Sequence, residues 1–316
     1  MADLSTLNLQ FLISLIIIII GYTLKRARIV DKEGAGKGFA RVIFNVTLPA
    51  VILQTLTKIK IDVAMIAMPF LAFLISGVIY AIAMVEHRKM PDKMMRGQMI
   101  MMSLGYNVGN FAYPLIQGVF GPDGLKYAAM FDAGNAFVIF MFCYILAMVY
   151  SAKEGERVQP KFIVKKIVTS PPLLSYILGI VLNVVGFQFP DVISNSGNTG
   201  VIDVIAKANT FITFLVLGIY LDFKLEKSYW KNLLKVMITR YSVGILLGIA
   251  FFLLWPVDIM PRTILLVCFI LPVGMGLLVF VVQCGYDEKF AGMLSNLMNM
   301  ISFGLIWVIL LVLSIA

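Results

Sequence analysis

The sequence has little charge, one histidine and few cysteines. Asp, Glu, Lys and Arg make up 14% of its 316 residues, against about a quarter in soluble globular proteins. The single histidine and the three cysteines, Cys143, Cys268 and Cys284, supply neither a zinc ligand set nor the framework of a disulfide-rich secreted fold. The His-Glu-x-x-His and Gly-x-Ser-x-Gly motifs of hydrolases are absent from the sequence. We therefore expect neither a soluble nor an intramembrane enzyme, and no metal or cofactor.

Long apolar stretches take the place of these features. Apolar residues make up 60% of the chain, and about 20 of them in succession can cross a bilayer as a helix. Charged clusters separate ten such stretches, which are 8–25, 39–57, 62–85, 97–119, 124–150, 171–188, 201–221, 232–255, 262–284 and 288–314. The pattern predicts an all-α polytopic membrane protein with ten transmembrane helices.

Basic residues are shared unequally between alternate connections. Of the 26 lysines and arginines, twenty fall in connections on one predicted side, four fall on the other, and Lys207 and Arg240 lie within stretches. Because cytoplasmic loops are enriched in Lys and Arg, the richer side is predicted to be cytoplasmic. Both termini are then outside, and the net charge of +9 requires no nucleic-acid partner.

The second half of the chain echoes the first. Met90-Pro91 precedes the fourth stretch as Met260-Pro261 precedes the ninth. Two repeats of five helices must have opposite orientations in the membrane, because five is odd. We expect a first repeat at 1–150, a cytoplasmic connection at 151–170 and a second, inverted repeat at 171–316, an arrangement typical of secondary transporters.

Helix-breaking residues interrupt the fourth and ninth stretches. Residues 105–114 read Gly-Tyr-Asn-Val-Gly-Asn-Phe-Ala-Tyr-Pro, and residues 271–276 read Leu-Pro-Val-Gly-Met-Gly. Glycine and proline disfavour a continuous helix. Each break lies roughly 15 Å along its helix from the charged end, near the middle of a hydrocarbon core about 30 Å thick. We therefore expect helices 4 and 9 to be broken, with breaks that can meet near the midplane.

A broken helix can bind an anion without a basic side chain. The helix that restarts near Asn107 presents unpaired N–H groups and the positive end of its dipole, and the two asparagines add amide donors. Glycines allow a ligand to approach the backbone closely. The predicted substrate-binding residues are Asn107, Gly109, Asn110, Pro272, Gly274 and Gly276. The alternative is that these residues serve only as kinks and packing notches, which are common in membrane helices.

These motifs resemble those of a known family. Asn107-Val-Gly109-Asn110-Phe-Ala-Tyr-Pro114-Leu is similar to the N-x-G-N-x-G-x-P-L motif of the auxin efflux carrier family, which includes plant auxin carriers and bacterial malate and malonate permeases. Phe44-Asn45-Val-Thr-Leu-Pro49 resembles the family's second-span signature, and Leu271-Pro272-Val-Gly274 its ninth. The resemblance extends over essentially the whole chain.

The resemblance implies two inverted five-helix repeats, a scaffold part, a mobile transport part, crossing helices 4 and 9, and a substrate carboxylate near Asn107. The chain departs from the plant carriers at Tyr106, where they have proline, and at Ala112, where the motif has glycine. The long cytoplasmic loop of many plant carriers is also missing. A compact bacterial permease for malate or malonate in the cytoplasmic membrane is therefore expected, and auxin is not the expected substrate.

Polar residues elsewhere in the stretches are candidates for coupling or for support of the site. Asp132 and Asn135 share one face of the fifth stretch, and a carboxylate within a membrane segment favours a functional role, either proton coupling or support of the site. The alternative is that Asp132, nine residues from Asp123 at the outer edge, only caps a helix or is hydrated. Asn45 and Asn299 are further candidates, and polar packing is the alternative for Asn299. Arg240 is predicted to extend to the inner membrane surface, like other long basic side chains near helix ends.

The sequence is compatible with two other functions. A broken crossing with asparagine side chains can also coordinate sodium, which would make the protein a sodium-coupled carrier of the bile-acid symporter class. A membrane sensor would bind the ligand without transporting it, although the sequence has no output domain. The expected partners are a small organic anion and the lipid bilayer, and whether the protein forms a homodimer is left open.

Overall fold

The computed structural model describes residues 4–58, 62–152, 169–195, 197, 199–221 and 227–315, and these residues are helical with no strand among them. The helices, in chain order, are α1 (Leu4–Arg26), η1 (Lys32–Gly36), α2 (Lys37–Val42), η2 (Ile43–Thr47), α3 (Leu48–Lys58), α4 (Val63–His87), α5 (Lys93–Ser103), η3 (Val108–Ala112), α6 (Tyr113–Phe137), η4 (Val138–Cys143), α7 (Tyr144–Ser151), α9 (Pro171–Val184), α10 (Val201–Tyr220), η5 (Lys227–Tyr229), α11 (Trp230–Leu254), α12 (Ile259–Phe269), α13 (Met275–Gln283) and α14 (Glu288–Ile315). The all-α fold class is confirmed.

Helices or pairs of helices coincide with the apolar stretches of the sequence. Among the described residues, six helical segments are long and apolar enough to cross a membrane: Gly34–Lys58, Val63–His87, Val108–Ser151, Val201–Tyr220, Lys227–Leu254 and Glu288–Leu313. Two further apolar helices, Pro171–Val185 and Ile259–Phe269, are shorter. The protein is therefore a multi-pass membrane protein, and ten crossings remain a prediction.

Local sequence explains where several helices begin and bend. The carboxylates of Asp62 and Asp92 accept hydrogen bonds from the backbone N–H groups of Met65 and Met95, at 2.8 and 3.0 Å, and so cap α4 and α5. The segment Val108–Ser151 spans 44 residues, which as one straight helix would measure about 66 Å. It turns instead at Gly121, whose φ of 62° suits glycine, followed by Pro122.

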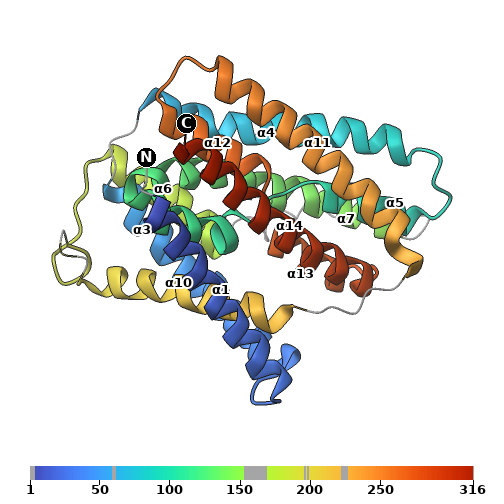
Figure 1. Cartoon of the computed structure of the whole chain (residues 1–316), viewed down its shortest axis with the longest axis horizontal. Coiled ribbons are helices and arrows are strands. Elements are labelled where there is room, and N and C mark those ends of the chain that lie inside the picture. The colour runs from blue at the N-terminus through green and yellow to red at the C-terminus, as the bar shows by residue number, and fades with distance from the viewer. Residues whose placement is uncertain are drawn as a thin grey trace.

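The helices form two groups that differ in composition and in continuity. Helix α10 packs against α1 and α3, and α3 packs against α9; these four helices are here named the α10 group. Helices α4, α5, α6, α7, α11, α12, α13 and α14 form the second set, here named the broken-helix group. Figure 1 shows α1 and α10 together at the lower left and α4 and α11 along the upper edge. Helix α6 also contacts α1, α3, α9 and α10.

Glycines bring the backbones of neighbouring helices into direct contact. A Cβ atom at Gly218 of α10 would lie 2.0 Å from the carbonyl oxygen of Ile18 in α1, and one at Gly21 would lie 2.2 Å from that of Leu215. In the broken-helix group, a Cβ atom at Gly134 of α6 would lie 2.4 Å from the carbonyl oxygen of Pro69 in α4. Such small-residue contacts are typical of helix packing in membranes.

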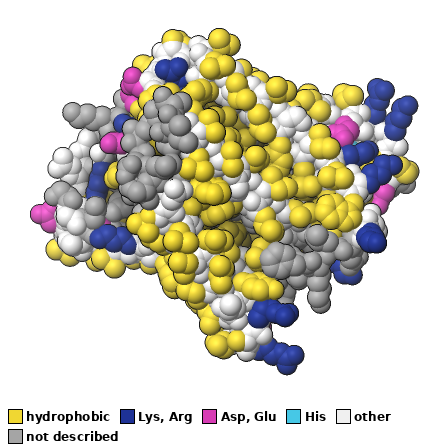
Figure 2. All heavy atoms as spheres, in the orientation of Figure 1, with side chains coloured by type: hydrophobic (Ala, Val, Ile, Leu, Met, Phe, Trp, Pro, Cys, Tyr) yellow, Lys and Arg dark blue, Asp and Glu magenta, His cyan; other side chains and the backbone are white. Residues whose placement is uncertain are grey.

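Apolar and basic side chains occupy different parts of the surface. Figure 2 shows a broad hydrophobic face, with Lys and Arg gathered at the right and lower edges. In the same view these edges carry the connection from α4 to α5 and the end of α1. A broad apolar face with basic residues gathered along the edges that carry these connections suits a molecule that crosses a bilayer.

The first turns of α1 lie against the last turns of α14. The indole N–H of Trp307 donates to the side-chain oxygen of Asn8 at 3.0 Å, and the rings of Phe11 and Phe303 have centroids 4.9 Å apart. The described ends of the chain therefore lie at the same end of the molecule (Figure 1).

Candidate functional site

Both predicted breaks are present, and their backbones pair with each other. Helix α5 ends at Ser103 and helix η3 begins at Val108, while α12 ends at Phe269 and α13 begins at Met275. The N–H of Asn107 donates to the carbonyl oxygen of Pro272 at 2.9 Å, and the N–H of Gly274 donates to that of Gly105 at 3.3 Å. Tyr106 and Val273 thus form a short antiparallel bridge. The bridge satisfies backbone groups that lipid could not.

Two glycines make this approach of the backbones feasible. Gly105 has a φ of 63°, a conformation that other residues adopt with strain. A Cβ atom at Gly274 would lie 2.8 Å from the side chain of Ile139 and 3.2 Å from the carbonyl oxygen of Tyr106. A side chain at either position would therefore force the two breaks apart.

The side chain of Asn135 in α6 pairs with the backbone of the first break, as a neighbouring strand would. Its side-chain oxygen accepts the N–H of Tyr106 at 2.7 Å, and its amide nitrogen donates to the carbonyl oxygen of Tyr106 at 2.8 Å. The same nitrogen donates to the carboxylate of Asp132 at 2.8 Å. The predicted shared face of Asp132 and Asn135 is therefore confirmed, and Asn135 holds the backbone of the break directly.

Asp132 connects the broken-helix group to the α10 group. Its side chain is buried, and its second oxygen accepts the hydroxyl of Tyr176 in α9 at 2.5 Å. The hydroxyl groups of Tyr176 and Tyr113 lie 2.7 Å apart. A Cβ atom at Gly109 would lie 3.3 Å from the Asp132 carboxylate, so the carboxylate lies directly beside the start of η3.

Arg240 contacts both breaks at once. The guanidinium donates to the carbonyl oxygens of Ser103, Leu104 and Gly105 at 2.7, 3.0 and 3.1 Å, and to that of Leu271 at 3.1 Å. It also lies 4.5 Å from the centre of the Tyr106 ring. The side chain is 1% exposed. The prediction that Arg240 extends to the membrane surface is therefore wrong, because backbone carbonyls freed by the breaks provide acceptors inside the protein.

Several buried polar atoms at the first break have no hydrogen-bond partner among the described residues. They are the amide nitrogen of Asn107, the side-chain oxygen of Asn110 and the hydroxyl of Tyr106. Asn107 is 3% exposed. A buried polar atom without a partner costs about 1 to 3 kcal/mol, so such atoms call for a ligand or water.

The start of η3 is also open to a ligand. Asn107 stands at its N-cap with φ −84° and ψ 66°, and no side chain caps the following N–H groups in the described structure. These free N–H groups and the helix dipole together favour a negative charge. An anion placed here would also meet the unpartnered amide nitrogen of Asn107.

The remaining predicted residues are placed differently. Pro272 contributes its carbonyl oxygen to the bridge, and a Cβ atom at Gly276 would lie 3.1 Å from Ile139, which makes Gly276 a packing position. Asn45 is exposed and donates to the carbonyl oxygen of Arg41 at 2.7 Å, so the structure does not bring it to the breaks. Asn299 is buried on α14, and its side-chain oxygen lacks a partner among the described residues.

Sequence reasoning did not single out Arg240, Tyr176 or Tyr113 for the site. Arg240 carried a signal, since it lies five residues beyond Lys235 in an otherwise apolar stretch. The two tyrosines carried none, because tyrosine is common in membrane helices near both surfaces.

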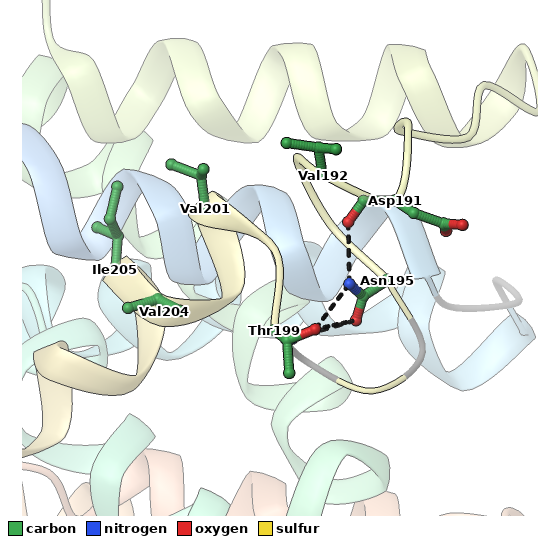
Figure 3. A pocket seen from close by; sticks show the side chains of 7 residues that line it. All are labelled: Asp191, Val192, Asn195, Thr199, Val201, Val204 and Ile205. Carbon is green, nitrogen blue, oxygen red and sulfur yellow. Dashed lines mark hydrogen bonds between the residues drawn. The ribbon is translucent and has the colours of Figure 1, made fainter.

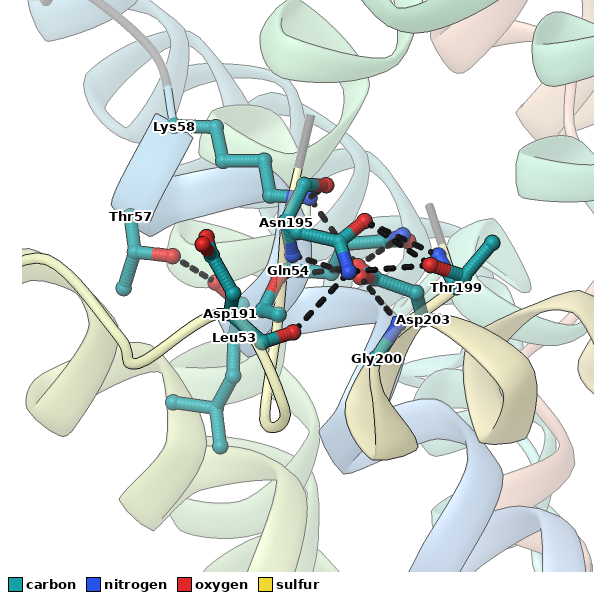
Figure 4. Close-up of polar contacts among 10 residues, drawn as sticks. Leu53, Gln54, Thr57, Lys58, Asp191, Asn195, Thr199, Gly200 and Asp203 are labelled. Atoms are coloured by element: carbon teal, nitrogen blue, oxygen red, sulfur yellow. Dashed lines mark hydrogen bonds and ion pairs between the residues drawn. The ribbon is translucent and has the colours of Figure 1, made fainter. Parts of the chain in front are cut away.

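A second buried carboxylate, Asp203 of α10, is fully paired. It accepts hydrogen bonds from the side chains of Gln54, Lys58 and Ser194 at 2.7, 2.9 and 2.8 Å, and from the N–H of Asn195 at 2.9 Å (Figure 4). These contacts join α3, the loop before α10 and α10 itself. The saturated cluster is a structural connection at one end of the α10 group.

A surface pocket of about 580 Å³ lies next to this cluster (Figure 3). Its lining is largely apolar and includes Val192, Val201 and Val204. The side chain of Asn195 is directed to its own loop, where it donates to the carbonyl oxygen of Asp191 and to the hydroxyl of Thr199, both at 2.9 Å. Polar groups with unmet bonding capacity are concentrated at the first break instead.

Comparison with known proteins supports a transport function. A family described as "Membrane transport protein" matches residues 9–313. An uncharacterized transporter of the archaeon Methanothermobacter thermautotrophicus is 25% identical over 66% of this chain and 66% of its own length. Another, of Methanocaldococcus jannaschii, is 28% identical over 56% of this chain and 57% of its own length. The chain therefore spans less than two thirds of the length of the curated relatives that it matches.

Proposed function

The chain belongs to the family of membrane transport proteins that includes the auxin efflux carriers, and on that premise we propose that it carries small organic carboxylate anions across the membrane. Malate and malonate are the proposed substrates. Transport proceeds as secondary active transport or uniport, by alternating access to the meeting point of the two breaks.

The observation that carries this proposal is the environment of Asn107. Its buried amide nitrogen has no partner in the described structure, and it stands at the uncapped start of η3. A carboxylate offers only acceptors, so it can take the amide hydrogen and the free N–H groups of η3 together. A basic side chain in contact with the substrate is not required for this form of recognition.

A second unpartnered atom favours malate over malonate. The side-chain oxygen of Asn110 is an acceptor without a partner among the described residues. Malate has a hydroxyl group that can donate to it, whereas the malonate dianion has no hydroxyl donor. Asn107 would then bind the carboxylate of a 2-hydroxy acid, and Asn110 would bind its hydroxyl.

The proposed architecture comprises ten crossings in two inverted repeats, 1–150 and 171–316, with broken helices that cross. Its support is that helices coincide with the predicted stretches and that the two breaks pair. The start of α1 also lies against the end of α14, as an even number of crossings requires. Residues 153–168 of the predicted connection 151–170 lie outside the described residues.

Alternating access is proposed to occur by an elevator movement. The broken-helix group moves with the bound substrate, and the α10 group stays as the scaffold. The hydrogen bond from Tyr176 to Asp132 spans the two groups, so this contact would have to break and reform in each cycle. Protonation of Asp132 would remove its charge and so weaken the hydrogen bond from Tyr176, which makes protons the proposed coupling ion.

The proposed location is the cytoplasmic membrane of a prokaryotic cell, with the termini outside. The basic edges seen in Figure 2 would then face the cytoplasm. Lipid is the surrounding partner, and cross-linking in the membrane would decide whether the carrier is a homodimer.

Sodium coupling is the second candidate. Two buried side-chain oxygens, those of Asn110 and Asn299, lack partners among the described residues, and amide oxygens are suitable ligands for a hard cation. Replacing sodium by choline should abolish uptake in this case and leave proton-coupled or uncoupled uptake unchanged.

The test of the proposed function is uptake of radiolabelled malate into proteoliposomes. Asn107→Ala should lower uptake at least tenfold without changing the yield of folded protein. Asn45→Ala is the matched control, because it removes an exposed amide that contacts only the carbonyl oxygen of Arg41 among the described residues. Uptake that persists in Asn107→Ala would remove this residue from the site, and binding without uptake by the wild-type protein would identify a sensor.

A further inference from the structure

The charge of Arg240 has no carboxylate partner. Its guanidinium forms four hydrogen bonds, all to backbone carbonyl oxygens, and no ion pair among the described residues. Arginine stays protonated in proteins, and a buried charge is ordinarily paired with an opposite charge. The described part of the chain therefore holds a buried positive charge that no acidic side chain contacts.

This charge lies directly behind the proposed anion site. Three of its acceptors belong to residues 103–105, which immediately precede the site residues, and the fourth belongs to Leu271 of the other break. The ring of Tyr106 covers the guanidinium. Arg240 thus acts on the site through the backbone that it holds and through its electric field.

We propose that Arg240 is the fixed counter-charge of the anion site, a positioning residue that raises carboxylate affinity in proportion to ligand charge without touching the ligand. The inference rests on the proposed function. A charge at roughly 10 Å in a medium of intermediate dielectric constant changes affinity by about tenfold for each charge of the ligand. A residue that only stabilised the fold would instead weaken all ligands by the same factor.

The experiment compares malate with lactate, since both are 2-hydroxy acids but malate carries one more carboxylate. Binding of each is measured by calorimetry on the full chain in lipid nanodiscs. In Arg240→Gln, affinity for lactate should fall about tenfold and affinity for malate about a hundredfold. The ratio of the two affinities, rather than either alone, reports the field of Arg240.

Arg262→Gln is the matched control. Arg262 also donates to backbone carbonyl oxygens, those of Asp258 and Phe252, but it lies at the start of α12 away from the breaks. Its loss should leave the malate-to-lactate ratio unchanged. An equal fall of both affinities in Arg240→Gln would overturn the proposal.

Arg240→Lys keeps the proposal testable if the glutamine variant does not fold. A buried lysine loses its proton more readily than arginine, so the malate-to-lactate ratio of this variant should decline between pH 7 and about pH 9.5. The wild-type ratio should stay constant. The wild-type protein is the control for the other ionisable groups near the guanidinium, Tyr106, Tyr241 and Cys143, for Cys268 beside Tyr106, and for Asp132 beside the start of η3.

A declining ratio in Arg240→Lys supports the proposal, and a constant ratio overturns it. A wild-type protein that binds neither acid would reject the proposed function itself, and the counter-charge with it. Wild-type binding with an unchanged ratio in both variants would reject the counter-charge alone.

Discussion

Among the described residues, each of the two helix groups contains one buried carboxylate, and the two carboxylates differ in their hydrogen-bond partners. Asp203 in the α10 group accepts hydrogen bonds from three side chains and two backbone N–H groups. Asp132 in the broken-helix group is bonded to Asn135 within its own group and to Tyr176 across the interface. Asp203 therefore stabilises contacts within one group, whereas Asp132 lies where the two groups meet.

The groups also differ in how they pack. The α10 group joins α1 to α10 by backbone contact at Gly21 and Gly218. The broken-helix group exposes backbone at the breaks and satisfies it with Asn135, Arg240 and the Tyr106–Val273 bridge. The helices α1 and α10 thus pack by close backbone contact, whereas the breaks bring polar groups together at one place.

The largest expected effect comes from adding a side chain at the glycine contact between α1 and α10. Gly218→Val should destabilise the protein by about 3 kcal/mol or more, because its Cβ would collide with the carbonyl oxygen of Ile18. Thermal unfolding in detergent measures this. Gly77→Val is the control, since a Cβ there meets nothing within 4 Å, and equal unfolding temperatures for the two variants would contradict backbone contact.

The next effect is from removing the support of the first break. Asn135→Leu leaves the N–H and carbonyl groups of Tyr106 without their side-chain partners, at a cost of about 2 to 3 kcal/mol. We expect lower thermal stability together with loss of malate binding. A variant that is less stable but binds malate normally would show that the break keeps its shape without Asn135.

A smaller effect tests the link between the two groups. Tyr176→Phe removes the hydroxyl that bonds Asp132, which should cost about 1 kcal/mol of stability and change the transport rate while leaving malate affinity within about twofold. Tyr286→Phe is the control, because it also removes a buried hydroxyl, bonded to the carbonyl oxygen of Ala147 within the broken-helix group. If both variants transport at the same rate, the Tyr176 contact does not limit the cycle.

The smallest effect concerns the saturated cluster. Lys58→Met removes the charge partner of Asp203. The Lys58 side chain is 35% exposed, and Asp203 keeps its hydrogen bonds from Gln54, Ser194 and Asn195, so the expected loss of stability is only about 1 kcal/mol. Transport per folded molecule should be unchanged. A selective loss of transport in this variant, with stability intact, would assign the cluster a part in the cycle.

The sequence predicts the main elements of the site better than their partners. Glycine, proline and asparagine have backbone preferences that act locally, so the breaks at 104–107 and 270–274 could be located without a structure. The spacing of Asp132 and Asn135 likewise follows from helix geometry. Both predictions depend on a few neighbouring residues.

Contacts between distant segments could not be derived in this way. Arg240 was expected at the membrane surface, but its acceptors belong to residues 103–105 and 271, which only the folded chain brings together. Asn45 was expected to support the site, yet the unusual turn of η2 leaves it exposed. Which face of a helix meets the interior depends on packing that apolar content alone does not specify.

The bridge between Tyr106 and Val273 has a consequence for how such a chain can be inherited. Each break supplies the backbone partner that the other lacks, so a protein made from either half alone would expose unpaired peptide groups in the membrane. A gene encoding one half could work only if its product associated with a second half that supplies the other break. The two halves of the coding sequence must therefore be inherited together, because the fold needs both breaks.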